Sequence, residues 1–554
     1  MKRKTLLYII FTLHIGFVLS QNNTKNSIHT KELPIEKIFV HYNTNQIVSG
    51  EQFFYKLYCL NKNNQPSKIS KIAYFEVINS KNESVLKQKI NLNNGVGYGD
   101  FFINNTIETG TYKIISYTKW MNNYRTFFED TIQIINPYTT DFESISETIQ
   151  SAHKNLDVKK ENELSTQNKR QKLTLDFLNN LSSGNYSVSV RLANSNDSYK
   201  KTLKNLNIGE NFIQDDTFQK KIILPELRGN LIEGEIIPID KSKGVKGLKI
   251  GLSIAGKKPI TKIATTNKSG KFYFSVENLS TSEIILQVLD KKNTDYKISI
   301  SNQKFSYNKK NNTVKAIALT PNEKDFILER SIYAQIENAY SLIKKDSSFY
   351  TSTSSSLLTS INQVVHLDDY TRFNSIRETI IEVLENVWFT KENNQFKIHV
   401  RDANKNTDTS FPSLLIVDGL IVSNHTDFFD FDPKKIKTVS LSQEKHVFGN
   451  NIYQGIMYVD TFKHNFGDDQ MNYQKFTILK PLPFKKYYQE NYSLNSKERI
   501  PDYRVQLFWE PNFDNNSKNL FFYTSDISGK FVIEVEGFDS SGNPISIQKF
   551  FTVK

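Results

Sequence analysis

Short segments of alternating apolar and polar residues, separated by turn residues, recur through most of this 554-residue chain. The segment 53–60 shows the pattern, because Phe53, Tyr55, Leu57 and Cys59 fall on one face of an extended strand. Similar segments follow at spacings of ~8–15 residues, with Asn, Gly or Ser between them. The 39 Phe and 27 Tyr residues also favour strands over helices. The pattern predicts an all-β sandwich as the basic unit of the fold.

The first twenty residues predict export. Lys2, Arg3 and Lys4 precede an apolar run at 5–19, and small residues lie just before Gln21. This is the pattern of a secretory signal peptide at 1–20. No Cys follows the run, which argues against a lipoprotein, and no later stretch is long and apolar enough to cross a bilayer as a helix. We therefore expect an exported protein in the periplasm or associated with the outer membrane, with the cell surface as an open alternative.

Charge and cysteine content exclude several classes of protein. The net charge is +13, and removal of the three basic residues of the signal leaves +10. The basic pairs Lys434-Lys435 and Lys485-Lys486 are short and scattered, which indicates solvated faces instead of a nucleic-acid site. A single Cys excludes a disulfide framework, a cysteine zinc site and an iron–sulfur cluster.

The segments group into a linear map of predominantly β units. We expect a β-sandwich at 35–137, a polar linker at 138–168, a second and less regular β unit at 169–227, and a third at 228–302 with a tight turn at Thr266–Gly270. Residues 303–365 predict a helix at Glu329–Lys345 followed by a flexible, exposed Ser/Thr joint at 347–355.

The pattern changes at 366–480 to a mixed α/β domain, in which Asn374 is placed to cap a helix. A C-terminal β unit follows at 503–554. The predicted fold class is mainly β, with tandem β-sandwich domains of macroglobulin or immunoglobulin-like type and one small α/β domain.

The first β unit carries a set of short motifs: Glu36-Lys37-Ile38 leading to His41, Ser49-Gly50-Glu51, Gly99-Asp100-Phe101-Phe102, and Ser116-Tyr117-Thr118-Lys119-Trp120-Met121. On these residues it resembles the second macroglobulin domain (MG2) of the α2-macroglobulin superfamily, and in particular a bacterial envelope branch. Pro225-Glu226-Leu227-Arg228-Gly229 is similar to a segment that recurs between β units in that branch, and 507–509 and 522–526 in the tail also resemble it.

Two further resemblances cover the middle of the chain. The third unit resembles the carboxypeptidase regulatory-like domain through Thr266, Asn267, Gly270, Phe272 and Phe274. Residues 366–480 resemble the plug domain of TonB-dependent receptors through the following segments: Leu415-Ile416-Val417-Asp418-Gly419, Phe431-Asp432-Pro433, Ile436-Lys437-Thr438-Val439, Phe448-Gly449, Gly455-Ile456 and Tyr458. The plug resemblance implies contact with an outer-membrane TonB-dependent transport system.

No arrangement of residues in the sequence predicts catalysis. Cys59 lacks the Glu-Gln that a macroglobulin thioester requires, and its strand position predicts a buried, unreactive thiol. No H-E-x-x-H or G-x-S-x-G motif is present. The weak candidates are His29 with Glu32, and His366 with Asp368 and Asp369, for which structural roles are favoured.

Three glycine motifs also favour structural roles. Gly251–Lys257 matches the core of a phosphate loop, but Lys258 and Pro259 replace the hydroxyl residue and the helix start. Gly95, Gly97 and Gly99 indicate a hairpin turn, and Asp418-Gly419 a turn at a strand end. We therefore expect no enzyme activity, no cofactor and no metal.

The predicted function is protein–protein interaction without catalysis. Phe428 and Phe429 are the candidate partner contact, because they lie in a polar loop at 423–429 beside Asn424, His425 and Asp427. The alternative within this domain is structural, with its free surface covered by the helix at 329–345. The alternative function is a surface adhesin or glycan-binding module that uses Tyr- and Phe-rich strand faces. The tail at 529–554 is loosely similar to a secretion signal, which leaves sorting to the cell surface open.

Overall fold

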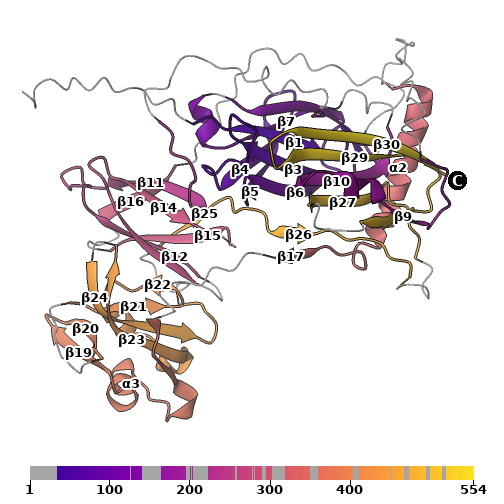
Figure 1. Ribbon diagram of the computed structural model, residues 1–554. Helices are drawn as coiled ribbons and strands as arrows, with labels where there is room; N and C mark the ends of the chain where they lie inside the picture. The colour runs from indigo at the N-terminus through magenta and orange to yellow at the C-terminus, as the bar shows by residue number, and fades with distance from the viewer. Residues whose placement is uncertain are drawn as a thin grey trace, which may run out of the picture.

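The computed structural model describes residues 34–124, 126–139, 164–194, 200, 202–203, 222–255, 259–277, 279, 281–289, 295–301, 319–349, 360–403, 411–449, 451–466, 473–493, 500–514 and 520–554. The predicted signal peptide and most of the linker at 138–168 lie outside these residues. The fold is mainly β, as the alternating segments predict. Figure 1 shows a core that holds the N-terminal and C-terminal strands, and an arm that extends from it and ends in the unit containing α3.

The first part of the core is a sandwich of two sheets. One sheet has the strand order β1-β3-β6, and the other has the order β2-β8-β7-β4-β5. All neighbours are antiparallel except β2 and β8. The strands are β1 (Lys37–Tyr42), β2 (Gln46–Val48), β3 (Gln52–Leu60), β4 (Ile72–Ile78), β5 (Ser84–Asn91), β6 (Val96–Phe102), β7 (Gly110–Tyr117) and β8 (Phe128–Ile135), with a 3-10 turn at Trp120–Asn123.

The second part of the core is built from segments that are far apart in sequence. Its main sheet has the order β27-β10-β29-β30, and β9 pairs with β28 beside it. The elements are β9 (Lys172–Thr174), a 3-10 turn at Asp176–Asn180, β10 (Gly184–Leu192), β27 (Gln506–Phe513), β28 (Phe521–Tyr523), β29 (Gly529–Asp539) and β30 (Pro544–Val553). The predicted units 169–227 and 503–554 are therefore wrong as separate domains. The local pattern identifies each strand but carries no information about a partner more than 300 residues away.

The β1-β3-β6 sheet is buried on both faces. Tyr55 and Leu57 of β3 belong to the core of their own sandwich. On the opposite face Lys56 donates to the carbonyl of Tyr186 at 3.0 Å, and Tyr58 donates to the carbonyl of Glu536 at 2.7 Å. The two parts of the core thus form one stack of sheets with a polar seam between them, which we define as Lys56, Tyr58, Arg191, Lys200, Glu534, Glu536, His41 and Ser187.

A long helix, α2 (Pro321–Ala339), packs on the core. Thr320 caps it in a capping box with Glu323, and Pro321 occupies its first turn. Ile327 is buried with Val48, Ile135 and Leu319. The predicted helix at Glu329–Lys345 therefore lies too far toward the C-terminus. The alternative in which this helix covers the α/β domain is wrong, because the buried face of α2 lies against β2.

The arm begins with the third unit. One sheet has the order β14-β11-β16 and the other the order β13-β12-β15-β25. The strands are β11 (Asn230–Pro238), β12 (Lys249–Ile254), β13 (Ile260–Thr265), β14 (Lys271–Val276), β15 (Glu283–Val288), β16 (Tyr296–Ile300) and β25 (Gln474–Thr477). Strand β25 comes from a segment that the sequence analysis assigns to the domain at 366–480. The chain therefore returns to the third unit after it has formed the α/β unit.

The arm ends in a mixed α/β unit. Its main sheet has the order β18-β23-β24-β21-β22, with β21 parallel to β24, and a hairpin β19-β20 lies beside it. The elements are β18 (Gln363–His366), α3 (Ile376–Val383), β19 (Val387–Glu392), β20 (Gln395–Val400), β21 (Leu414–Val417), β22 (Leu420–Ile421), α4 (Thr426–Phe429), β23 (Ile436–Phe448) and β24 (Asn451–Thr461), with 3-10 turns at Leu367–Asp369 and Pro433–Lys435. Ser375 caps α3, one residue beyond the predicted Asn374.

Two sets of contacts among the described residues lie where the chain passes between the core and the arm. Glu226, just before β11, is buried and accepts hydrogen bonds from Tyr74 and from the amide of Leu231, each at 3.0 Å. Further along the chain, β17 (Ser347–Phe349) pairs with β26 (Phe484–Lys486) in a two-stranded ribbon. The first three residues of the predicted Ser/Thr joint therefore form a strand with exposed side chains. The remainder of the joint lies outside the described residues.

Candidate functional site

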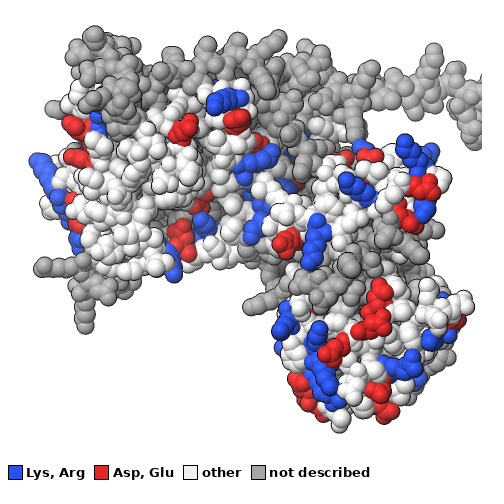
Figure 2. Space-filling model, turned by 180° about the vertical axis from the view of Figure 1, so that it is seen from behind, with Lys and Arg blue, Asp and Glu red and all other residues white. Residues whose placement is uncertain are grey.

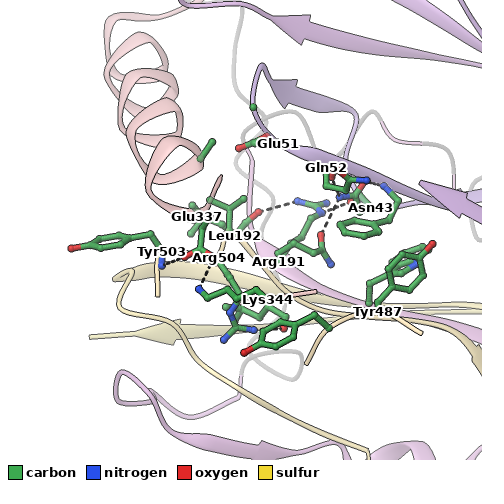
Figure 3. Close-up of a pocket in the computed structure, with 18 of the residues that line it drawn as sticks. Asn43, Glu51, Gln52, Arg191, Leu192, Glu337, Lys344, Tyr487, Tyr503 and Arg504 are labelled. Atoms are coloured by element: carbon green, nitrogen blue, oxygen red, sulfur yellow. Dashed lines mark hydrogen bonds and ion pairs between the residues drawn. The ribbon is translucent and has the colours of Figure 1, made fainter. Parts of the chain in front are cut away.

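A pocket of about 640 Å³ lies where the parts of the core meet α2 and the chain returning from the arm. Its walls come from the start of β3, the end of β10, the last turns of α2 with the residues after it, the segment 487–488, and 503–509. Figure 3 shows Asn43 and Gln52 at one end, Glu337, Lys344 and Tyr503 at the other, and Arg191 between them. Elements from four distant parts of the sequence thus build one cavity.

The turn before β3 holds α2 against this pocket. Gly50 has a φ of +95°, and a Cβ there would lie 3.3 Å from Ala334 of the helix, so glycine suits both the conformation and the close approach. The carbonyl of Gly50 accepts a hydrogen bond from Asn338 at 2.9 Å. The adjoining Glu51 binds Arg330 through two hydrogen bonds of 2.8 and 2.6 Å, in the bidentate geometry that suits a carboxylate and a guanidinium.

The charged residues at the α2 end are also paired with each other. Lys344 lies 2.7 Å from Glu337 and 3.6 Å from Asp502, and Arg504 lies 2.7 Å from Asp502. Burial by itself raises the pKa of Asp502, but the neighbouring Arg504 outweighs it and holds the pKa at about 2. Burial raises the pKa of Glu337, with Lys344 opposing it.

The opposite end of the pocket is aromatic. Phe54 stacks on Trp509 at a centroid distance of 5.9 Å and meets Tyr487 edge-on at 5.2 Å. Trp509 lines the pocket although it is only 3% exposed, and its indole N–H has no hydrogen-bond acceptor among the described residues. Such a buried donor gains free energy from any acceptor that reaches it.

The predicted contact residues lie elsewhere, in the α/β unit. Phe428 is fully buried in that unit's core, and Phe429 stacks on Phe396 at 4.1 Å. The polar neighbours organise the turn: Asn424 donates to Asp427 at 2.7 Å, and the Nδ1 of His425 accepts from the amide of Ile398 at 2.8 Å. Phe428 is therefore a core residue and not a surface contact.

Cys59 is fully buried, as its strand position predicts. Burial and the nearby Glu36 carboxylate raise the pKa of its thiol well above the ordinary value. A thiol kept protonated in this way is a poor nucleophile.

The remaining weak candidates have structural roles where the structure describes them. Asp368 pairs with Arg372, four residues along the chain, and Gly251 lies within β12. Gly95 forms a turn, and Gly97 and Gly99 lie in β6. His29 and Glu32 lie outside the described residues.

One three-residue group has ligand types that suit a divalent cation. Oxygen atoms of Asp418 and Asp460 and a ring nitrogen of His464 lie within 4.8 Å of one another, at the ends of the parallel strands β21 and β24. Asp418 also accepts hydrogen bonds from the amide of Thr461 at 2.7 Å, from its hydroxyl at 2.6 Å and from the amide of Phe466 at 3.1 Å. These hydrogen bonds satisfy the buried Asp418 carboxylate, which stabilises the Asp418-Gly419 turn.

Sequence reasoning does not find the pocket. Gly50 and Glu51 fall within a motif of the first β unit, but their partners Asn338 and Arg330 come from a segment with no recognisable motif. A pocket formed between distant segments leaves no local pattern.

Comparison with known proteins gives no family for this chain. No protein-family model and no curated protein matches it. Similar solved structures include the trypsin-activated α2-macroglobulin of Escherichia coli, with 9% identity over 94% of this chain and 41% of that one at a TM-score of 0.24, and a Salmonella α2-macroglobulin with 7% identity over 94% and 39% at 0.24. A tandem repeat from the extending region of a large adhesion protein has 6% identity over 94% and 100% at 0.14.

These similarities are too low to support a family or a function. The chain spans about two fifths of the length of the two macroglobulins. No helix among the described residues has both the length and the hydrophobicity needed to cross a membrane.

Proposed function

We propose that this chain is an exported protein of a Gram-negative envelope that binds a protein partner through the pocket and catalyses no reaction. The observation that carries the proposal is the charge pairing inside the pocket. Arg330, Lys344 and Arg504 each have a carboxylate within 2.7 Å, so three of the cations that line the pocket are held in close ion pairs.

These close ion pairs favour an uncharged ligand. A charged group that competes for Arg330, Lys344 or Arg504 would have to break a buried pair, and removal of one partner of such a pair typically costs ~3–5 kcal/mol. An uncharged segment with aromatic or aliphatic side chains would instead pack on Phe54, Phe102 and Tyr488. Aromatic side chains in a desolvated pocket are typical of interaction hot spots.

The location of the partner is proposed from the sequence. The signal peptide pattern at 1–20 favours the periplasm or the outer membrane, and the resemblance of 366–480 to a receptor plug favours a TonB-dependent transport system. The domains proposed for the arm are a carboxypeptidase regulatory-like unit at 228–302 and the plug-like unit, each of which has the sheet content that its resemblance implies.

A glycan is the second candidate ligand. The feature that favours it is the set of polar aromatic residues Tyr487, Tyr488, Tyr503 and Trp509 around one pocket. Flat rings of this kind stack on the apolar faces of sugars as well as on peptide side chains.

A single exposed side chain tests the proposal. Phe102 lines the pocket and is 49% exposed, and Phe462 on the α/β unit has the same exposure and serves as the matched control. We expect Phe102→Ser to lower recovery of a protein partner from detergent-solubilised envelopes by about tenfold, the effect of losing one hot-spot contact. Because the side chain is half exposed, the melting temperature should change by no more than about 2 °C.

The outcomes separate the candidates. Phe462→Ser should recover the partner at the wild-type level. Equal recovery with Phe102→Ser would contradict the pocket as the contact. Binding to a glycan array that depends on Phe102, without any protein partner, would favour the glycan instead.

A further inference from the structure

One wall of the pocket belongs to the chain that returns from the arm. We define the strap as residues 484–488, which comprise β26 followed by Tyr487 and Tyr488. Both tyrosines line the pocket, and just before the strap the amide of Leu482 donates to the carbonyl of Lys89 in the first sandwich at 2.8 Å. The pocket is therefore complete only when the strap lies on the core.

The strap is fastened to the core at one carboxylate. Lys485 lies 2.8 Å from Asp100 of β6, and the hydroxyl of Tyr487 donates to the same carboxylate at 3.3 Å. The carbonyl of Lys485 accepts a hydrogen bond from Tyr98 at 3.1 Å. Asp100 also accepts from Gln52, so one acid binds both the strap and the lining of the pocket.

Beyond this fastening the strap pairs with β17, and Phe484 packs on Tyr98 at a centroid distance of 5.8 Å. Its partner strand β17 is three residues long and exposes all three side chains. A two-stranded ribbon of this length is marginally stable in water. Beyond the ribbon, the amide of Tyr488 donates to Asp346 at 2.8 Å, and Asp346 comes from the outgoing chain of the same connection.

The strap covers the aromatic end of the pocket. Tyr487 belongs to the buried cluster of Tyr98 and Trp509, and it meets Phe54 edge-on. Trp509 is 3% exposed beneath this cluster, with its N–H unpaired among the described residues. Lifting the strap would expose Trp509 and Phe54, which line the pocket from the core.

We propose that the strap is a gate for the pocket, held closed by the Lys485–Asp100 ion pair and opened by release of the strap from the core. Release uncovers Trp509 and Phe54 for a partner segment and at the same time frees the segment through which the chain last returns from the arm. Binding of a partner in the pocket is then coupled to the contact between the core and the segment that returns from the arm. The biological role of this gate rests on the proposed function, but its opening is a property of the chain alone.

The test uses Trp509 as the reporter. The chain has three tryptophans, so Trp120→Phe with Trp388→Phe in the full chain leaves Trp509 as the only one. In that background, Lys485→Gln removes the ion pair, and Lys486→Gln changes the neighbouring exposed lysine of the same strand as the control. We expect Lys485→Gln to raise the acrylamide quenching constant of Trp509 by about twofold or more, because local opening exposes the ring.

A second measurement separates gating from general loosening. Hydrogen exchange should accelerate at 484–488 in Lys485→Gln while 506–513 of β27 keeps its protection, and Lys486→Gln should match the parent in both measurements. Unchanged quenching in Lys485→Gln would overturn the gate and leave the strap as a fixed wall. Loss of protection throughout β27 would also overturn it. Partner recovery that depends on Phe102 would survive either result, so failure of the gate is distinguishable from failure of the proposed function.

Discussion

Glu536 lies between the two parts of the core, and its raised pKa makes the stability of the fold depend on pH. It is 3% exposed in the polar seam and accepts hydrogen bonds from the amide of Leu203 at 2.9 Å and from Ser546 at 2.7 Å. Burial raises its pKa to about 7, with Lys200 opposing the shift and Glu534 adding to it. The folded protein therefore binds a proton here that the unfolded chain releases near pH 4.3.

The sign of the effect follows from linkage. A pKa raised in the folded state gives stability that is complete below the unfolded pKa and lost as pH rises through about 7. We expect the free energy of unfolding of the wild type to fall by about 1 kcal/mol relative to Glu536→Gln between pH 6.5 and pH 8. Urea unfolding of both proteins at the two pH values measures this difference.

The other buried titratable groups of the polar seam contribute the same pH dependence of stability to the wild type and to Glu536→Gln. Burial lowers the pKa of His41 and of Lys56 well below their ordinary values, so their contributions rise with pH. The pKa of Glu534 is lowered, because Lys200 and Arg191 outweigh its burial, so it titrates below this window. A difference between wild type and Glu536→Gln that stays constant from pH 6.5 to pH 8 would rule out the assignment.

Residue-scale predictions from the sequence succeed where strand alternation decides burial. Cys59 is buried because it shares a face with Tyr55 and Leu57. The same reasoning fails at Phe428, where neighbouring polar residues indicate a surface loop. In the structure His425 accepts a hydrogen bond from the amide of Ile398 in β20 and Asn424 bonds to the Asp427 side chain, while Phe428 fills the core.

At the scale of elements, Glu226 shows how a short segment joins two units. Its carboxylate lies 3.6 Å from Lys89 and 3.5 Å from Lys119, and both lysines come from the first sandwich. Burial lowers the pKa of Lys89 to about 8, with the Glu226 carboxylate opposing the shift. One buried acid thus holds two cations and the amide of Leu231 in β11 together.

Removing this charge should release the start of the arm. Glu226→Gln leaves Lys89 and Lys119 without a counter-charge in a buried site, and such a loss typically costs ~3–5 kcal/mol. We expect trypsin to cleave after the exposed Arg228 about tenfold faster in native Glu226→Gln, because local undocking exposes the backbone. Glu277→Gln, at an exposed acid close by, is the control. Equal cleavage rates in Glu226→Gln and the wild type would show that the junction is held by other contacts.

Element positions are better predicted than element partners. The segments that alternate in sequence form strands, and the turn at Thr266–Gly270 brings β13 to β14 with Gly270 at a φ of +76°. By contrast, β25 joins β15 across almost 200 residues, and β10 joins β27 and β29 across more than 300. Pairing at such separations is decided by packing of the whole chain, which a local pattern does not encode.

At the scale of the whole molecule, the chain passes repeatedly between core and arm. It leaves the core after Glu226, returns to form α2, leaves again through β17 and returns through β26 (Figure 1). The pocket lies at the last return. A molecule connected in this way is not a row of independent domains, and its candidate site belongs to no single unit of the linear map.

Among the described residues, the charged side chains do not gather into the one basic face that is typical of a nucleic-acid binder. Over the described part of the face in Figure 2, basic and acidic side chains are interspersed on both core and arm. This matches the expectation that the net charge is spread over solvated faces.

Site-specific photocrosslinking tests the central claim, that the pocket binds a protein partner, most directly. A benzophenone amino acid at position 102 of the full chain, expressed and exported in cells, should crosslink to one envelope protein on illumination. The same group at position 462, which has the same exposure, should not capture that protein. Capture at position 462 with none at position 102 would contradict the account and place the interaction on the arm.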